Sequence, residues 1–167
     1  MDDTHQADMV GRDEVQFRFR DDAMVDHPAV TVDSFVDQSN AAAVRLEPSD
    51  DARDLLGHLG RLGLVEVNFP AFTDGRGYSA ARLLREAGYE GELRAVGDVL
   101  IDQLAYMRRC GFDSFAPDRP LDEADAEAAF ARWPYVYQPA ADTHSPERSG
   151  EPSLGGVPIW TLRHGRS

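Results

Sequence analysis

Short apolar runs alternate with longer amphipathic segments from Ala42 onward, and this alternation restricts the fold more than any other feature of the chain. The apolar runs have the length of buried strands and span Ala43–Glu47, Leu64–Phe69, Glu92–Gly97 and Phe112–Ala116. Gly63, Gly88 and Gly111 each stand between an amphipathic segment and the next apolar run, the position of glycines that end helices. We therefore expect an α/β fold built of βα repeats, with a mainly parallel sheet of about four to five strands. Periodicity leaves two forms of the sheet, an open sheet or a partial barrel.

The helices between these strands are predicted from caps and apolar stripes. Ser49 is the predicted N-cap of a helix whose stripe is Leu55, Leu56, Leu59 and Leu62. A second helix is expected from Ser79 to Ala87. Asp98 is the predicted cap of a third, from Val99 to Cys110, with Leu100, Leu104 and Met107 on its buried face. Asp122 begins a fourth.

Composition divides the chain into three parts. Residues 1–13 are polar and expected to be disordered, residues 14–138 form the α/β domain with the repeat core at 42–138, and residues 139–167 form a flexible tail. Before the repeats, Glu14–Arg20 alternates like an edge strand, and Thr31 or Asp33 is placed to cap a short helix. Tyr135–Tyr137 is a candidate last strand. The apolar segment Val157–Leu162 either packs back on the domain or serves as a docking peptide.

Charge and cysteine content exclude several function classes. The chain carries 30 acidic residues against 17 basic ones, giving a net charge of −13. A nucleic-acid surface or an anionic membrane would need a basic footprint, so neither is expected as a partner. Cys110 is the only cysteine, which precludes an intramolecular disulfide and fits the cytoplasm. The five histidines share no ligand spacing, so no metal site is predicted, and the sequence identifies no cofactor.

Two loops are expected to meet at the carboxyl edge of the sheet, where open parallel sheets bind ligands. They are Pro70–Tyr78 and Gly97–Asp98, each followed by a predicted helix start. Backbone amides, a helix dipole and arginines would suit an anion. The predicted anion-binding residues are Asp74, Gly75, Arg76, Gly77, Tyr78, Ser79, Arg82, Arg94, Gly97, Asp98 and Gln103. The plain alternative is a tight turn at Asp74–Gly75 beside a solvated arginine.

Individual side chains at this edge have two interpretations each. Asp102 is the candidate general acid or base, or it simply complements the dipole of its helix. Tyr78 either stacks on a planar ligand or covers the helix start. Arg94 lies in a central strand and must be paired if buried, with Asp74, Glu92 or Asp102 as candidate partners.

The rim residues also resemble a known bacterial family. The similarity covers about Ala42–Gln138 and is carried by Phe69–Ser79, Ala81–Arg85, Gly91–Leu100, Asp102–Gln103 and Arg109–Asp113. It is to small proteins labelled "oxidoreductase probably involved in sulfite reduction". The resemblance implies a cytoplasmic accessory role in sulfur metabolism beside sulfite reductase and other sulfate-assimilation proteins, and no known catalytic residue.

Three roles are compatible with this resemblance. One is an oxidoreductase that uses the rim anion site. The second is a non-catalytic docking or assembly partner of the sulfite-reducing machinery, and the third is a sensor of a sulfur metabolite.

Overall fold

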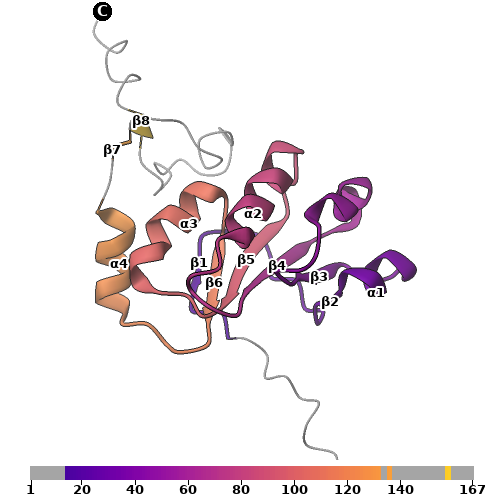
Figure 1. The fold of residues 1–167 in the computed structure, drawn as a ribbon. Helices are drawn as coiled ribbons and strands as arrows, with labels where there is room; N and C mark the ends of the chain where they lie inside the picture. Colours follow the sequence, from indigo (N-terminus) through magenta and orange to yellow (C-terminus); the bar gives the residue numbers. More distant parts are fainter. Residues whose placement is uncertain (1–13, 133–134, 137–156, 159–167) are drawn as a thin grey trace, which may run out of the picture.

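A computed structural model of the chain describes residues 14–132, 135–136 and 157–158 (Figure 1). Six strands form one open sheet in the order β1-β6-β5-β4-β3-β2. The strands are β1 Phe17–Arg18, β2 Val30–Thr31, β3 Ala43–Leu46, β4 Leu64–Phe69, β5 Glu92–Gly97 and β6 Ser114–Pro117. Strands β2 to β6 are parallel and stand in chain order, and β1 pairs antiparallel with β6. The predicted α/β class with a mainly parallel sheet is confirmed, and the sheet is open rather than curled into a barrel.

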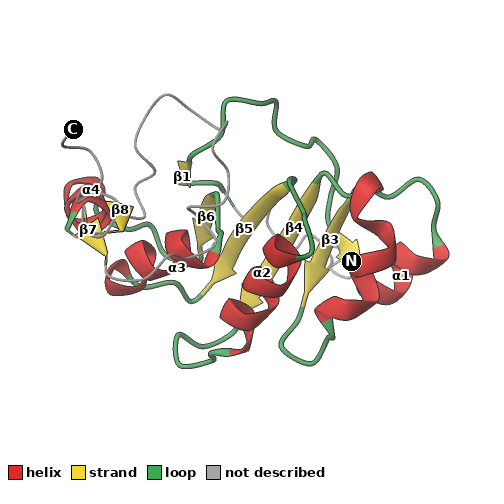
Figure 2. Ribbon diagram, turned by 90° about the horizontal axis from the view of Figure 1, so that it is seen from above, coloured by secondary structure: helices red, strands yellow, loops and turns green. Residues whose placement is uncertain are grey.

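All the helices lie on one face of the sheet (Figure 2). Right-handed crossovers that always step to the next strand require this arrangement. The helical elements are α1 Val32–Asp37, η1 Ala52–Arg61, α2 Arg76–Glu86, η2 Ile101–Gln103, α3 Leu104–Cys110 and α4 Glu123–Ala131. The core fills the space between these helices and alternate strand residues such as Val65, Val67, Leu93 and Phe115. None of the described helices has the length and apolar content needed to span a bilayer.

The N-terminal segment supplies both edge strands of the sheet. Strand β1 pairs Phe17 with Phe115, so the edge strand predicted within Glu14–Arg20 is confirmed, although it is limited to Phe17–Arg18. Phe17 and Phe19 pack edge-on against Phe130 of α4. Thr31 caps α1 by accepting a hydrogen bond from the Ser34 amide. This segment therefore provides both edge strands, β1 beside β6 and β2 beside β3.

The first long helix differs from its prediction. Asp51, not Ser49, is the N-cap, and the segment is a 3₁₀ helix. Gly57 and Gly60 lie within it and weaken an α-helix by their conformational freedom. Leu56, predicted on the buried stripe, is exposed, and the helix ends at Leu62 in an extended conformation. The cap prediction was wrong because the turn at residues 48–50 precedes the helix rather than belonging to it.

The later glycines behave as predicted. Gly88 and Gly111 have positive φ angles of 90° and 110°. After Gly111, the Phe112 amide donates to the Met107 carbonyl and completes a Schellman-type helix end. Strand β6 therefore begins at Ser114, two residues later than predicted. Cys110 is buried at the end of α3, as expected of a core residue.

The C-terminal part contributes one small described feature. Tyr135–Val136 forms β7 and pairs in parallel with β8, Val157–Pro158, rather than extending the main sheet. The predictions for residues 1–13, for most of the tail and for Ile159–Leu162 fall outside the described residues.

Charged side chains cross the sheet face that the helices leave uncovered. Glu66 accepts from Arg45 at 2.8 Å and from Arg94 at 3.3 Å. Glu92 accepts from Arg94 at 2.9 Å, from Ser114 at 2.6 Å and from Arg18 at 3.2 Å. These partners stand side by side in the strand register, for instance Glu66 beside Arg94 and Arg94 beside Ser114. Opposite charges on four strands and the Ser114 hydroxyl of β6 thus connect five adjacent strands.

This network predicts a pH-dependent contribution to stability. Burial raises the pKa of Glu92, but hydrogen bonds from Ser114 and Arg94 outweigh it, so the net pKa is lowered. A lowered folded-state pKa stabilises the fold above the unfolded pKa of about 4.3, and this stabilisation is lost as pH falls through the folded-state pKa. Glu92→Gln should lower the free energy of unfolding at pH 7 by about 3 kcal/mol, because Arg94 loses a buried partner.

Chemical denaturation of both proteins between pH 7 and pH 3 measures this difference. The gap between wild type and Glu92→Gln should narrow below about pH 4.3. Glu86→Gln, at an exposed helix position, is the control and should change little. A gap of constant size across the range would contradict this account of Glu92.

Candidate functional site

The carboxyl ends of β4 and β5 are joined closely at Gly97. Its φ angle is +97°, and a Cβ there would lie 2.4 Å from the Phe69 carbonyl oxygen. Only glycine allows this approach without strain. It lets the Asp98 amide donate to the Phe69 carbonyl at 2.7 Å. The loops after the two strands therefore meet at the edge where the sequence places them.

Asp98 and Gln103 fasten these two loops together. The Asp98 carboxylate accepts from the Phe72 amide at 3.0 Å, and the Gln103 side-chain amide donates to the Phe72 carbonyl at 2.7 Å. The side-chain oxygen Oε1 of Gln103 also accepts from the Leu100 backbone amide at 3.2 Å. Asp98 is thus not the predicted cap of the next helix, because its carboxylate is occupied across the loop and the next helical element, η2, has Leu100 at its N-cap.

Arg76 is held by the acid two residues before it. Asp74 accepts from the Arg76 backbone amide at 3.1 Å and from its guanidinium at 3.0 and 2.6 Å. These hydrogen bonds lower the pKa of Asp74 and raise the pKa of Arg76. Helix α2 begins here with Gly75 at its N-cap and no side-chain cap. The predicted start at Ser79 was wrong: Tyr78 and Ser79 lie inside α2.

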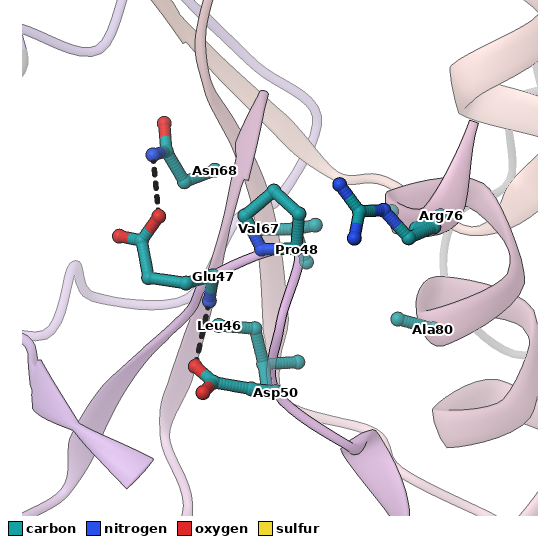
Figure 3. A pocket seen from close by; sticks show the side chains of 9 residues that line it. Leu46, Glu47, Pro48, Asp50, Val67, Asn68, Arg76 and Ala80 are labelled. Carbon is teal, nitrogen blue, oxygen red and sulfur yellow. Dashed lines mark hydrogen bonds between the residues drawn. The ribbon is translucent and has the colours of Figure 1, made fainter. Parts of the chain in front are cut away.

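A small pocket lies between Arg76 and the ends of β3 and β4 (Figure 3). Its volume of about 20 Å³ is room for about one water molecule. Glu47 accepts from the Asn68 side chain at 2.7 Å, and Asp50 accepts from the Glu47 backbone amide at 2.8 Å. Gly77 belongs to the same lining, and a Cβ there would clash with the Phe69 ring at 2.6 Å. Two carboxylates therefore share this pocket with Arg76, the one arginine among its described lining residues.

Three predicted site residues lie apart from these contacts. Arg94 is buried in the ion network on the sheet face opposite the helices. It is paired with Glu66 and with the predicted partner Glu92. Arg82 is half-exposed on α2 and lies 4.0 Å from Glu86. Asp102 is 86% exposed, with Arg132 at 4.0 Å.

Tyr78 covers the start of α2. Its ring lies 5.4 Å from Phe69 and 5.3 Å from Tyr106 of α3. Burial raises the pKa of Tyr78 to about 12, so its hydroxyl remains protonated at neutral pH. These contacts support the second of its two predicted roles, packing at the helix start.

Residues 43–148 match the family described as "Bacterial protein of unknown function (DUF934)". The chain belongs to this family. No curated protein and no solved structure matches the chain. The family assignment confirms the resemblance seen in the rim residues, and it assigns neither a reaction nor a partner.

The carboxyl edge of this family member is acidic, with two exposed apolar side chains. Among the described residues, its loops and first helical turns carry carboxylates at Glu47, Asp50, Asp51, Asp54, Asp74, Asp98, Asp102, Asp118, Asp122, Glu123 and Asp125, against arginines at Arg53, Arg76 and Arg119. Phe72 is 47% exposed and Leu100, predicted to be buried, is 36% exposed. Sequence reasoning missed Glu47, Asp50 and Asn68 as edge residues. Their position at the ends of two predicted parallel strands was the signal that would have found them.

The junction at Gly97 gives a direct test of the site's architecture. Gly97→Ala should lower the free energy of unfolding by about 2–3 kcal/mol, because the added Cβ meets a backbone carbonyl in a left-handed conformation. Gly75→Ala is the matched control. Gly75 has φ −82° and open space around a Cβ, so its substitution should change stability by less than about 0.5 kcal/mol. Equal urea midpoints for the two variants would contradict the proposed role of Gly97.

Proposed function

We propose that this protein is a cytoplasmic accessory protein of assimilatory sulfite reduction that docks its acidic carboxyl edge on a basic surface. The partner is sulfite reductase or another sulfate-assimilation protein. The pathway is proposed from the resemblance of the rim residues. The docking role is supported by one observation above all, the excess of carboxylates over arginines at the carboxyl edge.

Charge at this edge favours a basic partner over a small anion. Arg76 is already neutralised by Asp74, and Glu47 and Asp50 line the same pocket. An oxyanion entering there would meet more negative than positive charge. An arginine or lysine of another protein would meet complementary charge, which speeds association and selects partners.

Binding to purified sulfite reductase should therefore depend on salt and on edge charge. The association rate should fall about tenfold or more as salt rises from about 50 to 300 mM, since salt screens steering. Asp102→Asn should slow association. Glu86→Gln, a similarly exposed acid (71% against 86%) at the far end of α2, is the control and should leave it unchanged. Surface plasmon resonance measures both rates, and absence of binding would refute the docking role with this partner.

A second candidate function is oxyanion binding by an oxidoreductase at the same edge. It is favoured by Arg76, whose exposed guanidinium stands at the N-terminus of α2 beside the pocket. Such a site would hold a small ligand such as sulfite, and any redox chemistry would have to come from a cofactor. The pocket accommodates about one water molecule, so a flavin or nicotinamide would lie mostly on the surface.

Thermal unfolding separates the two candidates. If Arg76 binds an oxyanion, sulfite should raise the midpoint in a concentration-dependent way, and Arg76→Ala should abolish the shift. Arg82→Ala, which removes another exposed α2 arginine, is the control and should retain it. If the edge serves only for docking, neither sulfite, sulfate, phosphate, flavins nor nicotinamide nucleotides should shift the wild-type midpoint.

A further inference from the structure

We propose that Phe72 and Leu100 form the apolar centre of the docking edge, and that they enter an apolar recess bordered by arginine or lysine on the partner protein. This inference rests on the proposed docking function and specifies the contact that makes it. Its starting point is the exposure of two large apolar side chains, one from each rim loop, on an edge otherwise rich in carboxylates. Exposed apolar side chains rimmed by polar residues are typical of protein–protein contact sites.

The two side chains are brought together by the loop fastening. Phe72 is bound at its amide by Asp98 and at its carbonyl by Gln103. The same Gln103 side chain binds the Leu100 amide. One glutamine therefore contacts the backbone of both exposed residues, and it places them in one small region of the edge.

The hydrogen bonds of Asp98 and Gln103 also fix the backbone of Phe72 and Leu100 before a partner binds. Both backbone polar groups of Phe72 are satisfied within the protein, so the loop has no need to rearrange to satisfy them on binding. A contact already held in its binding geometry loses less conformational entropy on association. The hydrogen bonds of Asp98 and Gln103 thus make these residues positioning residues for docking.

The charges around the pair identify the chemistry of the partner. Asp98 contacts the Phe72 backbone and lies 3.7 Å from the exposed Arg119. The exposed Asp102 adjoins Gln103 in sequence and lies 4.0 Å from Arg132. Carboxylates bordering an apolar centre are matched by arginine or lysine bordering an apolar recess. A second copy of this chain would not provide these basic residues, because its own edge would place carboxylates against carboxylates. The observations therefore favour a different, basic protein over self-association.

The test compares the double variant Phe72→Ser/Leu100→Ser with Leu56→Ser, using purified sulfite reductase as the probe. Leu56 is 39% exposed on η1, away from the edge, and so matches Leu100 in residue type and exposure. The double variant should bind about 30-fold or more weakly, as expected of residues at the centre of an interface. Leu56→Ser should bind within about twofold of wild type. Equal unfolding midpoints for the proteins exclude loss of fold as the cause.

The outcomes separate this inference from the proposed function. If the double variant binds sulfite reductase as tightly as the wild type does, the Phe72–Leu100 contact is wrong, whereas the docking function is not affected. Failure of the wild-type protein to bind sulfite reductase overturns both the docking role with this partner and the Phe72–Leu100 contact made to it. Sedimentation equilibrium adds a further criterion: a wild-type dimer that the double variant abolishes would mean that a second copy occupies this surface, and it would overturn the basic partner.

Discussion

The structure depends on one topological constraint, the succession of parallel strands in chain order. Because every crossover steps in the same direction with the same hand, all helices are on one face of the sheet. Their apolar stripes and one set of alternate strand residues make the core. The other set of strand residues has no helix to pack against. The ion network from Arg18 to Arg45 and the two-sided character of the whole protein both follow from this asymmetry.

The ion network solves this problem with charge rather than apolar packing. Glu66 and Glu92 each bridge neighbouring strands, and Arg94 connects the two acids. A buried ion pair adds little net stability compared with apolar residues, because both charges lose water. It does penalise a wrong strand register, since a one-residue slip of a strand would turn the charges of that strand toward the apolar core. Arg94 therefore has a structural explanation that needs no ligand.

Local sequence patterns predicted the parts of the fold that local interactions determine. The bounds of β4 and β5 agree with the predicted runs Leu64–Phe69 and Glu92–Gly97. Both strands are paired on both sides and buried along almost their whole length, and their residues facing the helices are apolar. Caps were harder to predict. Ser49 and Asp98 are good capping residues, but Asp51 caps η1, and Asp98 instead accepts a hydrogen bond from the Phe72 amide. Sequence spacing identifies residues able to cap, whereas the choice between them depends on contacts across 26 positions of the chain.

The candidate site shows the same division between position and role. Topology was enough to predict that the loops after β4 and β5 meet, and the structure places Asp98 and Gln103 in contact with them. Their hydrogen bonds to the Phe72 and Leu100 backbones required the three-dimensional structure. These bonds fix the backbone of the two residues whose apolar side chains are exposed at this edge. Exposed apolar side chains on a fixed backbone, bordered by polar residues, are the physical argument for a contact surface here.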